Sequence, residues 1–298
     1  MTVPGAGDVS AREVAEGVLV LAIPMSPTLS TRSVALVGET TTLVDAGTAD
    51  GAGALVGALA RHGLPRVSDV VCTHFHHDHT GGLERLVQGG GVEVHAHVAE
   101  CGFVIRPDLF GRALRRAGIP AAIPAAAGVP EVSGVLDGQP FPVGGREWTA
   151  LHVPGHTWGH LAMWRAADRV LVAGDAVQGT GVPFAGVPGQ GTGIPYYVDV
   201  TAYRRSLDRM AALAPEVLVL AHENPAWEGT VLDRADAADA LARSTAEVER
   251  IDALVRDAVG SGARSASEIA ARVCAEFGAA ATPQAEVTVR AHLAAIDR

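Results

Sequence analysis

The chain has no lysine: all 23 of its cationic residues are arginine, and they stand against 33 acidic residues. The resulting net charge of −10 disfavours a nucleic-acid partner, because affinity for a phosphate backbone comes from neutralising phosphates with cationic side chains. A local basic patch is still compatible with this composition. The charge balance therefore makes a nuclease less favoured as an interpretation but does not exclude one.

Cysteines and long apolar runs are also scarce. The three cysteines, Cys72, Cys101 and Cys274, are odd in number and far apart, which is not the pattern of a disulfide framework. The first residues lack the basic stretch and apolar run of a signal peptide, and no apolar run is long enough to predict a transmembrane helix. We therefore expect a soluble, cytoplasmic protein with no membrane partner.

Enough apolar sequence is present for a sizeable core, since 48% of the 298 residues are hydrophobic. Over residues 1–234, segments rich in Val and Leu alternate with segments of helical periodicity, which predicts an α/β catalytic domain. Residues 235–298 keep only the helical spacing and predict a helical C-terminal appendage. The expected strands are 17–25, 33–39, 41–47, 68–74, 92–100, 146–155, 160–166, 169–177 and 216–223, and the expected helices before the appendage are 49–63, 80–91 and about 200–213.

Two segments interrupt this alternation. Residues 101–130 contain a proline-rich stretch with few apolar anchors, which predicts a linker or lid between two halves of the domain. Residues 178–197 are rich in Gly and Pro and form a long expected loop of the kind that often borders an active site. The sequence does not decide whether either segment closes over a substrate.

The most unusual stretch is CTHFHHDHTGG, at residues 72–82, directly after an expected strand. It offers His74, His76, Asp78 and His79, and imidazoles with a carboxylate are ligands that suit zinc, iron or manganese. In an extended stretch, residues two apart point to the same side, so the first two histidines can face one ion. The other two need a turn to reach a second ion.

Further ligand types stand at the ends of three later strands. His156 follows LHVP, Asp175 follows VLVAG, and His222 follows VLVLA. Side chains at the carboxyl ends of several strands meet at one edge of a sheet. The sequence therefore predicts a site for two metals at that edge.

This ordered set of ligands resembles the metallo-β-lactamase superfamily of hydrolases over roughly residues 15–225. The stretches VDAG (44–47) and PGHTWGH (154–160) resemble accessory motifs of the same family, and several motifs in the right order are far more specific than one His-x-His. The resemblance implies an αββα sandwich of two similar halves with metals at one edge. The helical tail resembles a branch with a winged-helix-like C-terminal segment, which includes thioesterases of the glyoxalase II type.

The resemblance also implies the role of each ligand. The first metal would be held by His74, His76 and His156, the second by Asp78, His79 and His222, and Asp175 would bridge them. The family usually has Gly-His-Gly around the last histidine, whereas this chain has Ala-His-Glu. Two divalent ions are implied, most commonly zinc, with iron or manganese as alternatives.

Other histidines and polar residues near these motifs have less specific patterns. Asp45 is expected to support the metal loop through hydrogen bonds. His160 could support a ligand in the same way or be a packed histidine, and His77 is expected to point away from the metals. His95 and His97 are expected in the core or on the surface, and no functional role is expected for His62, His152 and His292.

The expected chemistry is hydrolysis. Two close metals would share a bridging water and lower its pKa, and Asp78 would orient the hydroxide and carry a proton to the leaving group. No Gly-x-Ser-x-Gly motif predicts a serine nucleophile. We expect a small acyl thioester or related ester as substrate, carried on coenzyme A or a carrier protein, with Tyr196 and Tyr197 framing the acyl group.

Three alternatives remain open at this point. A tyrosine near the metals is also a feature of lactonases in this family. A basic face on the tail would favour a nucleic-acid-processing enzyme, and a single iron would favour a dioxygenase on the same scaffold. The fold does not choose among these activities, and the sequence leaves the acyl group and the oligomeric state open.

Overall fold

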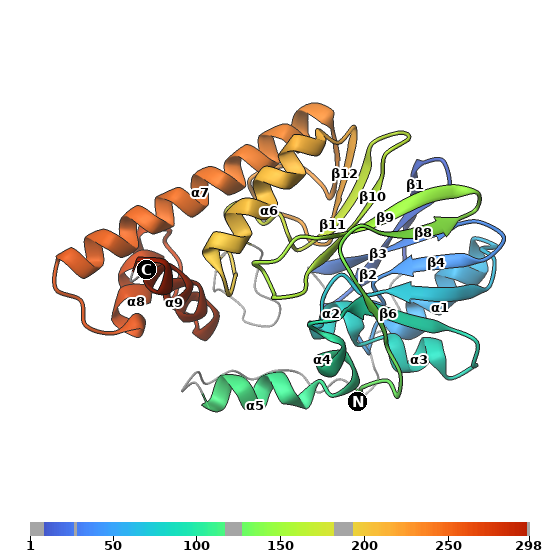
Figure 1. Cartoon of the computed structure of the whole chain (residues 1–298), viewed down its shortest axis with the longest axis horizontal. Helices are drawn as coiled ribbons and strands as arrows, with labels where there is room; N and C mark the ends of the chain where they lie inside the picture. The colour runs from blue at the N-terminus through green and yellow to red at the C-terminus, as the bar shows by residue number, and fades with distance from the viewer. Residues whose placement is uncertain (1–8, 27–28, 117–126, 182–192, 297–298) are drawn as a thin grey trace.

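The structure is a computed structural model that describes residues 9–26, 29–116, 127–181 and 193–296. Two β-sheets pack against each other, and helices cover the outer face of each sheet (Figure 1). The α/β class and the αββα sandwich implied by the resemblance are confirmed. None of the described helices is long and apolar enough to cross a membrane.

The first sheet takes its strands in chain order, antiparallel from β1 to β4 and parallel from β4 to β7. The second sheet has the order β13-β12-β11-β10-β9-β8, and its β11 and β12 are parallel. The strands are β1 (Ala11–Ala15), β2 (Val18–Pro24), β3 (Ser30–Val37), β4 (Thr41–Val44), β5 (Val67–Val71), β6 (Glu93–His97), β7 (Ser133–Val135), β8 (Gln139–Val143), β9 (Arg146–His152), β10 (Leu161–Arg165), β11 (Val170–Gly174), β12 (Val217–Leu220) and β13 (Val231–Asp233).

The helices follow the alternation expected from the sequence, with differences in length. The helices are α1 (Ala52–Arg61), α2 (His77–Thr80), α3 (Leu83–Val87), α4 (Cys101–Ile105), α5 (Asp108–Arg116), α6 (Val200–Leu213), α7 (Arg234–Gly260), α8 (Ala266–Glu276) and α9 (Pro283–Ile296). The expected helix 80–91 is the shorter α3, the short α2 precedes it in the histidine-rich segment, and the segment after β6 carries two more.

The core between the two sheets explains why the central strands are continuous apolar runs. Val71 and Val135 of the first sheet share this core with Trp148 and Met163 of the second. The outer faces are covered as well, so all five residues of β11 are buried. Strands buried on both faces lose the alternation of polar and apolar residues.

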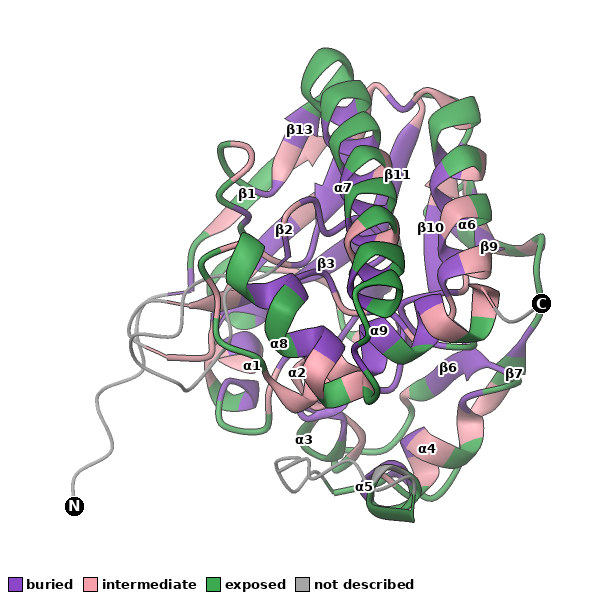
Figure 2. Ribbon diagram, turned by 90° about the vertical axis from the view of Figure 1, so that its left-hand side faces the viewer, coloured by how far each residue is buried: buried purple, intermediate pink, exposed green. Residues whose placement is uncertain are grey.

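The C-terminal helices do not have a core entirely of their own. The first half of α7 packs its buried stripe onto α6 and the second sheet, while the rest of α7 packs with α8 and α9 (Figure 2). Ile194, from the loop before α6, joins the second of these cores. The division into a catalytic domain and an appendage at residue 234 stays a prediction, although α7 does begin there.

The expectation for residues 101–130 is corrected. Residues 101–105 and 108–116 are helical, anchored by Phe103 and Phe110, which pack against the outer core of the first sheet. The segment joins β6 to β7 of one sheet, so it does not connect two halves. Its residues 117–126 and residues 182–192 of the second expected loop lie outside the described residues.

Candidate metal centre

The histidine-rich segment begins just after β5. His74 and His76 precede α2 in chain that is still extended at His76, and α2 then carries Asp78 and His79. Gly82 allows this turn, because a Cβ there would lie 2.2 Å from the carbonyl oxygen of Ala46. The two pairs of ligand-type residues enter two different clusters.

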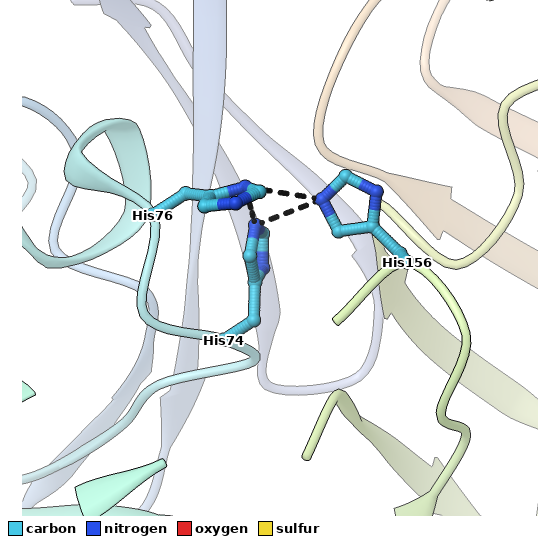
Figure 3. Close-up of side chains that lie close together, drawn as sticks. All are labelled: His74, His76 and His156. Atoms are coloured by element: carbon cyan, nitrogen blue, oxygen red, sulfur yellow. Dashed lines mark hydrogen bonds between the residues drawn. The ribbon is translucent and has the colours of Figure 1, made fainter. Parts of the chain in front are cut away.

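The first cluster contains three imidazoles and is called here the three-histidine cluster: His74, His76 and His156. Figure 3 shows the rings converging from the loop after β5 and the loop after β9. The facing nitrogens are 2.9 Å apart between His74 and His76, and His156 Nε2 lies 3.2 Å and 3.1 Å from them. Tetrahedral zinc with bonds of about 2.0–2.1 Å places its nitrogen ligands at a similar spacing.

The second cluster mixes carboxylate and imidazole and is called here the mixed cluster: Asp78, His79 and His222. Asp78 Oδ2 lies 3.1 Å from His222 Nε2 and 3.7 Å from His79 Nε2. His222 follows β12, the strand end predicted for it. Its neighbour Glu223 turns to Arg32, whose guanidinium donates to it at 2.9 Å, so Glu223 does not bond to His222.

Asp175 lies between the two clusters. Its Oδ1 faces the mixed cluster, 3.4 Å from His222 Nε2 and 3.6 Å from His79 Nε2, and its Oδ2 lies 3.6 Å from His156 Nε2. Asp175 Oδ1 and His79 Nε2 are buried without a hydrogen-bond partner. Buried polar atoms are costly unless satisfied, so converging atoms of this kind fit a bound cation.

The two clusters differ in their electrostatics. Burial is the main cause that lowers the pKa of all three imidazoles in the three-histidine cluster. Burial acts in the same direction on His79 and His222, but nearby carboxylates outweigh it and raise both pKa values. Burial disfavours ionisation of Asp78 and Asp175, yet the imidazoles hold the pKa of both carboxyls below the usual range.

Asp45 supports the mixed cluster through the Nδ1 atom of His79, on the side of that ring away from Nε2. Its carboxylate accepts hydrogen bonds from the backbone N–H and hydroxyl of Thr73, at 2.7 Å and 2.8 Å, and contacts His79 Nδ1 at 2.8 Å. The residue has φ of +65°, in the left-handed region that Asp tolerates better than most residues. The hydrogen bonds expected for Asp45 from the sequence are present, and they direct His79 Nε2 towards Asp78 and Asp175.

Glu100 supports the three-histidine cluster through hydrogen bonds to the two loops that carry it. No sequence pattern indicated this residue. Its carboxylate accepts from the N–H of Phe75, at 3.0 Å, and from the N–H of Gly159, at 2.7 Å. It thereby joins the loop of His74 and His76 to the loop of His156. Burial raises the pKa of Glu100 to about 7, although both backbone donors oppose this shift.

Two further contacts fix ligands on the side of the second sheet. His160 Nε2 accepts from the N–H of Asp175 at 3.1 Å, and the His160 ring stacks on His74. Gln178, another residue without a sequence signal, donates to the carbonyl of Asp175 and accepts from the N–H of Tyr196. His160 is therefore both fully buried and in contact with the site.

The two tyrosines expected to frame a substrate have different positions. The Tyr196 ring lies 5.6 Å from His76 and 5.3 Å from His156, between ring centroids. Tyr197 is fully buried and its hydroxyl contacts His292 on α9, so it cannot frame a substrate as expected. This contact also gives His292 a role that the sequence did not indicate.

The remaining histidines lie outside both clusters. The side chain of His77 is one-third exposed. It does not belong to any group of described His, Cys, Asp and Glu side chains that lie close enough to share a metal ion. His95 is buried on β6 and contacts Asp69 of β5 at 2.8 Å. His97 is also buried and stacks on His152.

Comparison with known proteins gives consistent matches. The family model of the metallo-beta-lactamase superfamily matches residues 28–222. A probable metallo-hydrolase of Bacillus subtilis (strain 168) is 30% identical over 61% of this chain and 75% of its own length. A hydroxyacylglutathione hydrolase of Pseudomonas paraeruginosa is 34% identical over 52% of this chain, but the match covers only 46% of that enzyme.

Solved structures match over nearly the whole chain. A metallo-beta-lactamase family protein from Thermus thermophilus aligns with a TM-score of 0.72 at 26% identity, covering 96% of this chain and 94% of that one. A beta-lactamase domain protein from Burkholderia ambifaria aligns with a TM-score of 0.74 at 25% identity, covering 99% and 90%. These matches extend beyond the sandwich into the C-terminal helices.

Proposed function

The chain belongs to the metallo-β-lactamase superfamily, and on that premise we propose that it uses two divalent ions, most commonly zinc, to hydrolyse an acyl thioester or related ester. Similarity to a metallo-hydrolase and to hydroxyacylglutathione hydrolase supports a metal-dependent hydrolase. The bond cleaved and the metal count are our proposals. The observation that carries them is Asp175, whose two oxygens face two separate clusters of ligand-type side chains.

The donor set fits such ions. Imidazole nitrogens and carboxylate oxygens are the usual ligands of zinc and also suit iron and manganese. Ions held there would supply a water activated near neutral pH and would polarise the acyl oxygen. The chain itself contributes neutral imidazoles in one cluster and ionised carboxylates in the other, with buried hydrogen bonds to His79 and to the backbone of Asp175.

Asp78 is the residue proposed to move a proton. Its carboxylate contacts His222 and is partly exposed, unlike the buried His79 beside it. The low pKa of Asp78 keeps it ionised and able to accept a proton from an attacking water. It can then return that proton to the leaving group as the acyl bond breaks.

An aromatic wall beside the three-histidine cluster supports an acyl substrate. It consists of Phe75, Phe103, Phe110 and Trp158, of which Phe75 and Phe110 are buried in the outer core of the first sheet and Trp158 presents the exposed surface. Phe110 lies 5.8 Å from His76 and 6.4 Å from Trp158 between ring centroids, and Trp158 is 47% exposed. Because His76 is the only partly exposed member of its cluster, the wall begins where the site is open. Aromatic side chains in such a position suit the apolar part of a small ligand.

Lactone hydrolysis is the second candidate, because the Tyr196 ring lies within 5.6 Å of His76 and could contact a lactone ring. A nucleic-acid substrate is not proposed. Residues 234–296 contain seven arginines and nine acidic residues, and most of these arginines pair with a carboxylate. The tail therefore offers no basic face among its described residues.

The test measures free-thiol release from acyl thioesters of coenzyme A, glutathione and a carrier protein, with zinc-loaded protein and a metal-stripped control. Metal-dependent thiol release is the expected result. A matched panel of lactones is assayed by proton release. Hydrolysis of lactones alone would replace the thioester proposal with the second candidate, and a single bound iron without hydrolysis would favour a dioxygenase.

A further inference from the structure

His156 can bind a metal through Nε2 only if the proton of its neutral ring sits on Nδ1. In the structure, Nδ1 lies 2.9 Å from the carbonyl oxygen of Tyr196. Nδ1 also contacts the amide nitrogen of Gln178, but that nitrogen donates to the carbonyls of Asp175 and Tyr196, at 3.0 Å and 3.2 Å. A carbonyl in that position accepts the Nδ1–H bond and leaves the lone pair on Nε2. The Tyr196 carbonyl therefore sets the tautomer and the direction of His156.

The position of that carbonyl is fixed from the C-terminal helices. Thr288 of α9 is fully buried, and its hydroxyl donates to the carbonyl of Pro195 at 2.8 Å. The same hydroxyl lies 3.4 Å from the N–H of Tyr197, which donates to it. Thr288 thus contacts the backbone on both sides of Tyr196.

A second contact extends the connection deeper into the tail. The Tyr197 hydroxyl lies 2.7 Å from His292 Nε2, and His292 Nδ1 lies 2.9 Å from Asp252 Oδ1 on α7. Arg256 donates to the other carboxylate oxygen of Asp252 at 2.7 Å. Tyr197 and His292 are fully buried, and a satisfied buried network of this kind restricts the backbone it holds.

We infer that Thr288 is a positioning residue for His156, with His292 as its support, so that the C-terminal helices set the metal affinity of the three-histidine cluster. This inference rests on the proposed metal site. It gives the tail a part in metal binding without any contact between the tail and the metal. The hydroxyl of Thr288, rather than its methyl group, carries the effect.

The test replaces Thr288 with Val, which keeps the shape and removes the hydroxyl. Zinc affinity is measured by competition with a chromogenic chelator. Removal of groups that orient a metal ligand typically weakens binding by about 10- to 100-fold, and we expect a loss of that size for one of two zinc ions. Thr288→Ser, which keeps the hydroxyl, should restore the affinity to near the wild-type value.

The matched control is Thr245→Val on α7, where the lost hydroxyl bonds only to the carbonyl of Leu241 within the helix. It should leave zinc affinity unchanged. Nitrogen-15 NMR of the metal-free protein reports the His156 tautomer directly, and Thr288→Val should reduce the population protonated on Nδ1. Tyr197→Phe removes one hydroxyl and should give a smaller loss of affinity; it replaces Thr288→Val if that variant does not fold.

These experiments distinguish failure of the inference from failure of the proposed function. Wild-type zinc affinity in a folded Thr288→Val variant, or equal losses in the Val and Ser variants, would overturn the inference and leave the proposed function intact. A wild-type protein that binds no metal at all would instead remove the proposed function.

Discussion

The three-histidine cluster and the mixed cluster are neighbours on either side of Asp175, yet they would hold a cation in different ways. Burial lowers the pKa of the imidazoles in the first, whereas nearby carboxylates raise the pKa of the imidazoles in the second. Glu100 supports the first and Asp45 supports the second. If each cluster holds one ion, as proposed, the difference implies that the two metal positions can be perturbed one at a time.

Asp175→Ala should have the largest effect, because it removes the one side chain that both clusters share. We expect loss of bound metal from both positions and hydrolysis no faster than that of metal-stripped protein. Metal content by plasma emission and thiol release are the measurements. The exposed Asp50→Ala serves as control, and full activity in Asp175→Ala would contradict the dinuclear assignment.

Removing one histidine from each cluster should separate the two positions. His156→Ala is expected to lose the ion of the three-histidine cluster and keep the other, and His222→Ala is expected to do the reverse. Each variant should therefore hold one equivalent of zinc after dialysis, since each removes a ligand of one cluster and leaves Asp175 in place. If either variant emptied both positions, the clusters would be one cooperative site.

Substitutions of Glu100 and Asp45, which hold the ligand loops through hydrogen bonds, should lower metal affinity less, and each should affect one cluster only. Glu100→Gln cannot accept from both Phe75 and Gly159, because one of its terminal atoms is now a donor. Asp45→Asn loses an acceptor in the same way, while Asn tolerates the left-handed backbone of this position. We expect zinc affinity about 10- to 100-fold lower at the supported cluster only, in chelator competition. Equal losses at both clusters in both variants would contradict separate support.

The last effect is a pH dependence of stability that is specific to Glu100 and does not involve a metal. The folded protein keeps the proton of this carboxyl up to a pKa of about 7, whereas the unfolded chain releases it near the ordinary value of 4.5. Between these values the folded state binds more protons, so the free energy of unfolding falls as pH rises, by about 3 kcal/mol in total. Urea unfolding of metal-free protein from pH 4.5 to 8 should show this fall.

Glu100→Gln is the comparison for that measurement. It has no ionisable group at position 100, so the difference in unfolding free energy between wild type and variant should shrink as pH rises through this range. A difference that stays constant with pH would show that Glu100 ionises at its ordinary value in the folded protein.

The parts of the site that could be predicted from the sequence are those with a local pattern. His74 to His79 stand together, and the later ligands stand at strand ends in the order of a known family. Glu100 could not be predicted, because it acts through Phe75 and Gly159, which are far away in the chain, and Gln178 lies in a Gly-rich stretch with no pattern that marks its contacts. His292 had no pattern apart from a place in a helix, and its contact with Tyr197 spans 95 residues.

The fold shows the same division. Long Val- and Leu-rich strands were predicted close to their observed bounds, while the short strands β1, β7, β8 and β13 were missed. The helices in residues 101–116 were missed because proline-rich sequence nearby favoured a linker. Phe103 and Phe110 pack against the aromatic ring of Phe75 and fix these helices through tertiary contacts that no local pattern predicts.

The wide spread of the ligands along the chain also sets an order of assembly during synthesis. The three-histidine cluster is complete in sequence once His156 has been made, whereas the mixed cluster must wait for His222, and the Thr288 contact comes later still. At about 5–20 residues per second, these stages are separated by seconds. On the proposed dinuclear site, a nascent chain would carry the ligands of one metal position, with Asp175, before those of the other, and the supporting contact from α9 would form last.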